Sequence, residues 1–570
     1  MFVCKARFAK FFVLFLCINS LFILSSQFFV LPKLFDGYWF YSLFYRESML
    51  FCTYFLVFVL IFYIPFSWLQ SFIFYIFTFI SLLLFILNIF LIFHFDSTLN
   101  PYLLSIALQS DPKEAREFLS VYFDFRVILI SLLFLAFFYF VFKKTKALTR
   151  GGGIRVFYIF LILLLFVISA HVFKFRPHYE RYSDVIYNAT LSFNQSLNRI
   201  LKSMNEYEQI SKNFDIFIKD INYTKIDEKD KIDNIVLIIG ESTQRNLMQI
   251  YGFELEDTPN LVKLKQENPD NLLVFDDVIS SQTTTYEALA QVLTFYNQDT
   301  KERNWSQFLN VIDAIKLAGY KAINISNQEK FSLWDKASTT IFHRSDKVFY
   351  TSMSDYFEQS KPDEVVLPVI SRILKEKKQD EKLFLSVHLM GNHAVYYNRY
   401  PKEFDRFKKE DLDESIKGRK TIAEYANNTL YGDFVLSSII DKFKHSDSIV
   451  IFLSDHGEEV YDRGEHYLHN DAKISRFMVE IPFIIYVSDE FIKKHEELYK
   501  RIKASTNKPF MSDDLIHALI DIAGNDHFKI DGYESKRSLF YEGNFTRQRI
   551  VGKTNLKDYD KELKGQKRIY

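Results

Sequence analysis

Five long apolar stretches lie in the first third of this 570-residue chain, and they limit what this part can fold into. The stretches lie near residues 11–31, 48–64, 69–94, 123–142 and 154–174. Each is close to the length of about 17 to 25 apolar residues that a helix needs to cross the hydrocarbon core of a bilayer. They are apolar on every face, whereas a helix on the surface of a soluble domain keeps a polar face. The sequence therefore predicts five transmembrane helices rather than a soluble helical domain with an apolar core.

The basic residues beside these stretches predict their orientation. Lys5, Arg7 and Lys10 precede the first stretch, and a basic loop without acidic residues separates the fourth from the fifth. Because basic loops stay in the cytoplasm, both segments are expected on the cytoplasmic side, and the fifth crossing then exports the rest of the chain. A cleaved signal peptide explains the first stretch less well, since no small-residue cleavage site follows it and four more stretches do.

Charge gives no sign of a nucleic-acid partner, and cysteine content rules out cysteine-based sites in the exported part. The 70 basic residues are balanced by 70 acidic residues, so the net charge gives no argument for a nucleic-acid partner. The three cysteines, Cys4, Cys17 and Cys52, all lie in or beside the first two apolar stretches. The exported part is therefore expected to have neither a disulfide nor a cysteine metal site.

From residue 233 onward, short apolar segments alternate with helical patterns. Strands are predicted over 235–239, 272–279, 321–326, 383–389, 448–454 and 481–487. This alternation predicts an α/β domain with a mainly parallel sheet and helices on both faces. The organisation is thus a transmembrane domain over 1–174, a helical bridge over 175–230 and an exported α/β domain over 231–570. The bridge is expected to lie along the membrane surface or, equally, to pack on the soluble domain.

Polar groups suited to metal chemistry follow three of the predicted strands. Glu241 follows "NIVLIIG", Asp455 and His456 follow "SIVIFLS", and a third strand leads into the threonines 283–285 before a helix. Carboxylates with an imidazole suit Zn²⁺ or a similar divalent ion. A metal and a helix N-terminus both favour the alkoxide form of a hydroxyl, so Glu241, Asp455 and His456 around Thr283 predict a metal-activated nucleophile.

Each of these groups alone also fits a simpler explanation. A glutamate after a strand is often a solvated loop residue, and threonines before a helix are often N-caps. Their occurrence at successive strand ends favours a site. His393 and His469 lie beyond such strand ends as well, where they are expected to hold a second metal or to bind phosphate oxygens. Isolated surface histidines are the alternative.

Together these motifs resemble a known family. "IIGEST", the threonines at the head of a helix, "HLMGNH" followed by "YYNRYP", "SDHGEEVYD" and "YLHN" resemble the phosphoethanolamine transferases of Gram-negative inner membranes. These enzymes belong to the sulfatase and alkaline phosphatase-like superfamily. The resemblance implies an N-terminal five-helix transmembrane bundle plus a C-terminal α/β sulfatase/alkaline phosphatase-like domain in the periplasm. "ISNQ" and "HGEEVYD" lean toward the branch acting on the lipopolysaccharide core.

The resemblance also implies a ligand set. The zinc ligands of the family fall on Glu241, Thr283, Asp455 and His456, the nucleophile falls on Thr283, and the cofactor is one or two Zn²⁺ ions. Matching "VISSQT" to the family's "VTSCGT" favours Thr283 over the two threonines that follow it. Members of the family often carry a cysteine and disulfides where this chain has none, so this fold must depend on its core.

Contacts to the substrates are implied in the same way. Contacts to phosphate or to a second metal fall on His393 and His469. The segment "SDPKEAREFL" resembles the loop that contacts the donor lipid, which indicates Glu114 and Ser110. A lysine that contacts phosphate in some members has no clean match in this chain, and Lys330 is the candidate for its place.

The function implied is transfer of phosphoethanolamine from phosphatidylethanolamine to a lipopolysaccharide acceptor, either a lipid A phosphate or a core sugar. A phospho-threonine type intermediate links the two halves of this double displacement. The setting is a multi-pass protein of the bacterial inner membrane with a cytoplasmic N-terminus, a periplasmic catalytic domain and no nucleic-acid partner. The alternatives are another lipid-linked phosphoglycerol or phospho-group transferase of the superfamily, or an inactive membrane-anchored binding protein.

Overall fold

The computed structural model describes residues 11–21, 24, 37–95, 125–144, 209–227, 231–300, 304–328, 336–351, 361–464, 467–524 and 527–569. Two compact units make up the chain. The first extends to Met204, and the second begins at Asn205 and takes nearly all of the rest.

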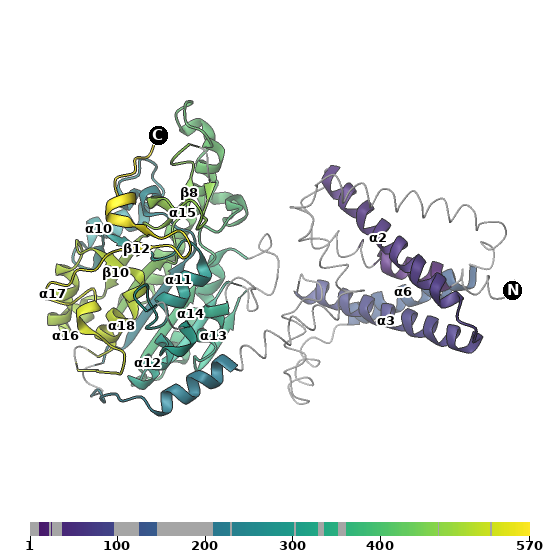
Figure 1. Ribbon diagram of the computed structural model, residues 1–570, viewed down its shortest axis with the longest axis horizontal. Helices are drawn as coiled ribbons and strands as arrows, with labels where there is room; N and C mark the ends of the chain where they lie inside the picture. The colour runs from purple at the N-terminus through teal and green to yellow at the C-terminus, as the bar shows by residue number, and fades with distance from the viewer. Residues whose placement is uncertain are drawn as a thin grey trace. The chain divides into compact units, whose positions relative to one another are not determined.

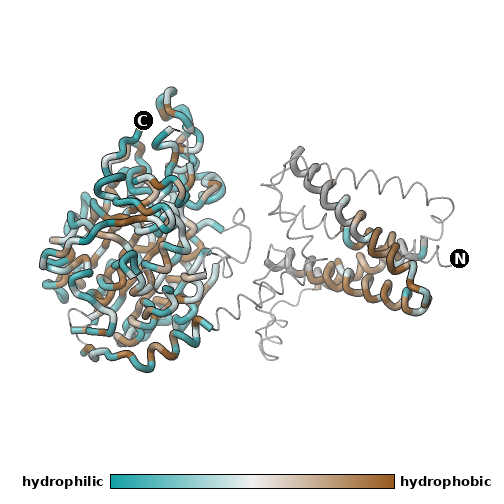
Figure 2. Tube along the Cα trace, in the orientation of Figure 1, coloured by the Kyte–Doolittle hydropathy of each residue, from teal (hydrophilic) through white to brown (hydrophobic). Residues whose placement is uncertain are grey.

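The described part of the first unit is helical and apolar. Helices α2 (Gly37–Phe62), α3 (Ser67–Phe95) and α6 (Phe125–Lys144) follow a helical segment over 11–21. Figure 2 shows mostly apolar residues in the coloured parts of these helices. Phenylalanine rings fill the contacts between them, as in the stacked pair Phe58 and Phe74, whose centroids lie 5.0 Å apart.

One of the described helical stretches is long and apolar enough to cross a membrane, namely Ser67–Leu87. Phe11–Leu21 and Ile128–Phe140 are apolar but shorter. Four of the five predicted spans overlap described helices, and the fifth, 154–174, lies outside the described residues. The structure therefore supports one crossing by length and composition, and the prediction of five rests on the sequence.

A seven-stranded sheet in the order β2-β10-β7-β1-β6-β4-β5 forms the centre of the second unit (Figure 1). Its strands are β1 (Asn234–Gly240), β2 (Leu272–Val274), β4 (Lys321–Ser326), β5 (Lys347–Tyr350), β6 (Leu383–His388), β7 (Ser448–Ser454) and β10 (Phe483–Val487). Strand β1 pairs in parallel with β6 and β7, and β10 runs antiparallel to both β7 and β2. The mainly parallel sheet expected from the sequence is confirmed.

Alternate residues of β1 face opposite sides of the sheet, as the pleat of a strand requires. Ile235, Leu237 and Ile239 belong to one apolar core, and Val236 and Ile238 belong to another. The first core is completed by α11 (Thr285–Val292), α12 (Val311–Leu317) and α18 (Leu515–Gly524), and the second by α10 (Pro259–Glu267), α14 (Val366–Glu376) and α15 (Arg419–Asp441). Helices therefore cover both faces of the sheet and fix the positions of the strand ends.

Shorter elements complete the unit. They are α13 (Lys336–Phe342), α16 (Asp489–Lys494), α17 (Glu496–Ala504), β3 (Val278–Ile279), β8 (Glu459–Val460), β9 (Tyr467–Leu468), β11 (Phe510–Met511), β12 (Ile550–Val551) and β13 (Lys557–Asp558). The small strands pair outside the main sheet as β3 with β11, β8 with β9 and β12 with β13.

The structure divides the strand predicted over 272–279 into two. Strand β2 joins the main sheet through β10, while β3 pairs with β11 in a separate sheet. The break falls at Asp277, whose carboxylate accepts a hydrogen bond from the Arg549 guanidinium at 2.6 Å. The local apolar pattern does not show this change of partner, since β10 and β11, with which the two halves pair, lie about 200 residues further along the chain.

The described part of the bridge packs on the second unit. Residues 209–219 form a helix whose Phe214 is buried in the same apolar core as one face of β1. Arg344 pairs with Asp215 of this helix at 2.9 Å. Residues 209–219 thus form a helix that packs on the apolar core of the second unit, and residues 175–208 lie outside the described part.

Candidate functional site

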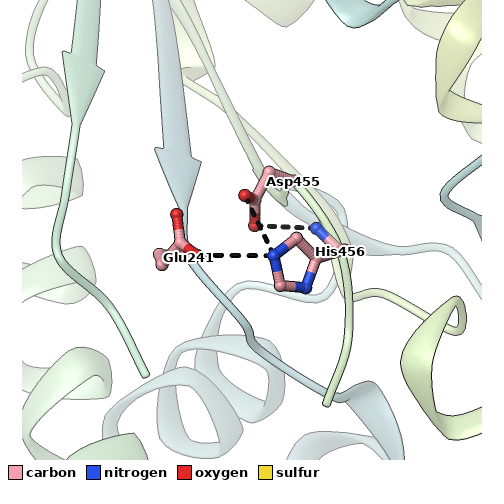
Figure 3. A group of neighbouring side chains, drawn as sticks. All are labelled: Glu241, Asp455 and His456. Carbon is pink, nitrogen blue, oxygen red and sulfur yellow. Dashed lines mark hydrogen bonds and ion pairs between the residues drawn. The ribbon is translucent and has the colours of Figure 1, made fainter. Parts of the chain in front are cut away.

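The ends of β1 and β7 bring three of the predicted ligands together. Gly240 and Ser454 are partners in the parallel ladder, so Glu241 and Asp455 leave adjacent strands at the same level. His456 follows Asp455, and Figure 3 shows the three side chains of Glu241, Asp455 and His456 converging. All three are buried, and one ligand atom from each lies within 4.8 Å of the others.

Hydrogen bonds fix the backbone around these side chains. The Asp455 carboxylate accepts from the Ser242 amide at 3.1 Å and from the His456 amide at 2.7 Å through Oδ1. Ser242 takes a positive φ of 54°, which turns the chain sharply after Glu241. The ligand-bearing loops are therefore tied to each other as well as to the sheet.

The donor atoms fit a zinc ion. His456 Nε2 lies 3.4 Å from Glu241 Oε1 and 3.5 Å from Asp455 Oδ2. The Nδ1 atom of the same ring lies 2.8 Å from the Gly457 carbonyl, to which it donates as an N–H, so Nε2 is left as the ligand atom. Asp455 Oδ2 is buried and has no hydrogen-bond partner among the described residues, as expected of an oxygen that serves a metal.

The electrostatics of the cluster favour a positive charge at its centre. Burial would lower the pKa of His456, but the negative charges of Asp455 and Glu241 outweigh it and raise the pKa to about 10. Burial would raise the pKa of Glu241, yet the hydrogen bond and charge of His456 leave it lowered. Burial and the Glu241 charge together raise the pKa of Asp455 well above its usual value. The carboxylates of Glu241 and Asp455 thus share the single positive charge of His456. A divalent cation at the same place would balance both negative charges.

The structure places Thr285, and not the predicted Thr283, next to this cluster. Thr285 Oγ1 donates to Glu241 Oε1 at 2.9 Å and lies 3.4 Å from His456 Nε2. Thr285 is the first residue of α11, so its hydroxyl also stands at a helix N-terminus.

Thr283 occupies a different environment. Its hydroxyl is buried, and among the described residues it makes no hydrogen bond. Helix α11 begins at Thr285 and Thr284 before it is extended, so the hydroxyl at the helix N-terminus beside Glu241 is that of Thr285.

The two predicted histidines lie beside the cluster. The His469 and His456 rings have centroids 4.1 Å apart, and His469 Nδ1 lies 3.3 Å from Glu458 Oε1. Burial, together with Arg399 and His469, outweighs the charge of Glu241 and lowers the pKa of His393 to about 4. Both imidazoles therefore stand near the charge of Glu241.

Two neighbours of the cluster were missed by sequence reasoning. Glu458 is fully buried next to His469, and the only hint of it was its place in "HGEE". Gly391 lies against the backbone of Glu241, and nothing in the local sequence indicates that approach. The predicted contacts Glu114, Ser110 and Lys330 all lie outside the described residues.

Comparisons with known proteins show which family the chain resembles. The family model described as Sulfatase matches residues 233–525. Phosphoethanolamine transferase EptC of Escherichia coli strain K12 is 28% identical over 80% of this chain and 81% of its own length. Phosphoethanolamine transferase CptA of Salmonella typhimurium is 27% identical over the same shares of the two chains.

A solved structure is similar as well. The C-terminal periplasmic domain of EptC from Escherichia coli, in complex with Zn, aligns with a TM-score of 0.56 and 30% identity over 61% of this chain and 98% of that one. The resemblance to phosphoethanolamine transferases that the motifs predicted is confirmed.

Proposed function

The chain belongs to the sulfatase family, and from this premise we propose that it transfers phosphoethanolamine to a lipopolysaccharide acceptor through a covalent threonine intermediate. The observation that carries the proposal is the Thr285 hydroxyl, held at the N-terminus of α11 within 2.9 Å of Glu241 Oε1. The relatives named phosphoethanolamine transferases align over 80% of the chain, which supports this reaction. No observation favours a different phospho-group donor or an inactive binding protein.

Glu241, Asp455 and His456, with Thr285, would hold one zinc ion. When bound, zinc would lower the pKa of the threonine hydroxyl and neutralise charge that develops on the phosphoryl oxygens. The orphaned Asp455 Oδ2 and the paired carboxylates support this assignment. His393 and His469 remain the proposed contacts to phosphate or to a second ion.

The residues of the chain divide the reaction into two displacements. Thr285 Oγ1 attacks the phosphorus of phosphatidylethanolamine, a new O–P bond forms, and the bond from phosphorus to the diacylglycerol oxygen breaks. Thr285 gives up its proton in this attack, and diacylglycerol takes up a proton and leaves, so the intermediate is a phosphoethanolamine ester of Thr285. An acceptor oxygen then gives up its own proton and attacks the same phosphorus, the bond from phosphorus to Thr285 Oγ1 breaks, and Thr285 takes up a proton to recover its hydroxyl. Glu241 orients Thr285 before the first step, because its Oε1 accepts the hydrogen bond of the free hydroxyl.

Donor and acceptor are proposed to be lipids, which explains the apolar first unit. Tethering the catalytic domain to the bilayer confines it to the surface where both substrates lie and raises their effective concentration. We place five spans within 1–174, a bridge over 175–230 and the periplasmic catalytic domain over 231–570, with the N-terminus in the cytoplasm of a bacterial inner membrane. The donor is then expected to contact Glu114 and Ser110, and its phosphate Lys330.

The experiment that tests the function is mass spectrometry of lipopolysaccharide from a deletion strain complemented with the wild type, Thr285→Ala or Thr283→Ala. We expect the added mass of phosphoethanolamine with the wild type and with Thr283→Ala, and none with Thr285→Ala. Fragmentation separates lipid A from the core and so identifies the acceptor. Loss of the modification with Thr283→Ala alone would return the nucleophile to Thr283, and an unmodified glycolipid with the wild type would reject this acceptor class.

A further inference from the structure

The segment 566–569 lies against the two loops that carry the proposed metal ligands. The Arg568 guanidinium donates through Nε to Asp462 Oδ1 at 2.6 Å and through Nη2 to Gln244 Oε1 at 2.7 Å. Its Nη1 donates to the Asn246 carbonyl at 3.0 Å. One side chain therefore reaches both the loop after β1 and the loop after β7.

Gln244 connects the same two loops a second time. Its side-chain amide donates to the Glu458 carbonyl at 2.6 Å and to Asp462 Oδ2 at 2.9 Å. Gln244 stands three residues after Glu241, and Glu458 stands two residues after His456. Arg568, Asp462 and Gln244, called the Arg568 clamp here, thus join the segments on which the ligands sit.

The clamp is held in place by its surroundings. Asp462 is fully buried, and its Oδ2 also accepts from the Val460 amide at 2.9 Å. The guanidinium lies 5.6 Å from the ring centroids of Phe253 and of Phe477. The Ile569 amide donates to the Asp462 carbonyl at 2.9 Å, so the backbone of the segment is fixed as well.

We propose that Arg568 is a positioning residue for the metal cluster. The β1–β7 ladder ends at Gly240 and Ser454. Beyond that pair the Ser242 amide joins the two loops through Asp455, and the Arg568 clamp joins them again farther from the strands. A planar guanidinium with several donors spans three acceptors at once, which a point charge does not. The inference rests on the proposed function, because it assumes that the cluster binds zinc.

The test measures zinc affinity of the full-length protein in detergent by competition with a fluorescent chelator, alongside the melting temperature of the metal-free protein. We expect Arg568→Ala to weaken zinc binding at least about tenfold, as loss of outer contacts to metal ligands commonly does. Arg568→Lys should recover part of the affinity, because the ammonium still pairs with Asp462 but does not also reach Gln244.

Arg344→Ala is the matched control, because it also removes a guanidinium from a buried carboxylate, Asp313, but touches none of the cluster. It should lower the melting temperature and leave zinc affinity unchanged. If Arg568→Ala behaves like this control, Arg568 is merely structural and the proposal is overturned.

Gln244→Ala tests the proposal if Arg568→Ala does not fold. It removes the hydrogen bonds of the Gln244 side chain to Arg568, Asp462 and Glu458, while the pair between Arg568 and Asp462 remains. Unchanged zinc affinity in Gln244→Ala would overturn the proposal, and weaker binding would support it. A wild-type protein that binds no zinc would instead reject the proposed function, and the clamp with it.

Discussion

Gly391 lies directly against the backbone of Glu241. A Cβ atom on Gly391 would stand 2.6 Å from the Glu241 amide nitrogen and 2.8 Å from its carbonyl oxygen. The next amide, of Asn392, donates to the Glu241 carbonyl at 2.8 Å. The loop after β6 therefore packs directly against the backbone of the proposed zinc ligand Glu241. This close approach is possible because Gly391 has no side chain.

Gly391→Ala is expected to displace Glu241 and to reduce transfer more than tenfold. The methyl group overlaps backbone that has no room to move, and Gly391 has a φ of 49° that alanine adopts with strain, so stability should fall by about 1–3 kcal/mol. Gly252→Ala is the control, since Gly252 also has positive φ but nothing lies within 4 Å of its added Cβ. Lipopolysaccharide modification and thermal unfolding measure both variants, and equal activity of the two would contradict the expectation.

Removal of metal should abolish transfer, and Zn²⁺ should restore it. Glu241→Gln removes a charge from the cluster and is expected to weaken zinc binding about 10- to 100-fold. Glu381→Gln serves as the control because Glu381 pairs with Lys321 ahead of β6, at the opposite end of the strands from the site. Zinc titration of both proteins gives the result, and full activity in the presence of a strong chelator would argue against a metal.

Asp433 caps helix α10 from the neighbouring helix α15. Its carboxylate accepts from the amides of Asn260 and Leu261, each at 2.9 Å. Asp433→Ala leaves these donors without partners and should cost about 2 kcal/mol of stability. Asp433→Asn keeps one acceptor oxygen and should cost less. Both variants should retain wild-type kcat, because Asp433 lies outside the site. Urea unfolding measures the loss of stability, and a transfer assay measures kcat.

The stability of the protein should fall as the medium becomes acidic, with His517 as one cause. Burial, with the positive charges of Arg537 and Arg547, lowers the pKa of His517 to about 3. In the unfolded chain the pKa is about 6.5, so the unfolded chain takes up the proton first as the pH falls. The stabilisation from this residue is complete above about pH 6.5 and decreases toward pH 3, with a loss of about 2 kcal/mol between pH 7 and pH 5.

Urea unfolding of metal-free wild type and His517→Gln at pH 7 and pH 5 measures this contribution. The ring accepts a hydrogen bond from the Glu534 amide at 3.1 Å, and glutamine offers an acceptor in its place without titrating. The loss of unfolding free energy between pH 7 and pH 5 should be about 2 kcal/mol smaller in His517→Gln than in the wild type. An equal loss in both proteins would assign the acid sensitivity to other groups.

Local sequence predicted much of this site because parallel strands bring their carboxyl ends to one edge. Two apolar segments, "NIVLIIG" and "SIVIFLS", have the pattern of buried parallel strands. The residues that follow such strands lie close together at one edge of the sheet, and this does not depend on how the helices pack. Glu241, Asp455 and His456 were found in this way. The apolar stretches near the start likewise predict a membrane setting from composition and length, without any tertiary contact.

The sequence by itself therefore determined the class of fold and the residues at the strand ends, since both depend on patterns within about ten residues. Tertiary structure decided which of three adjacent threonines faces Glu241, because that depends on where α11 starts and how it packs. It also decided the approach of Gly391 and Arg568, which lie about 150 and 330 residues from Glu241 along the chain. Only folding brings such distant segments together, because contacts between them follow from packing of the whole domain and not from local periodicity.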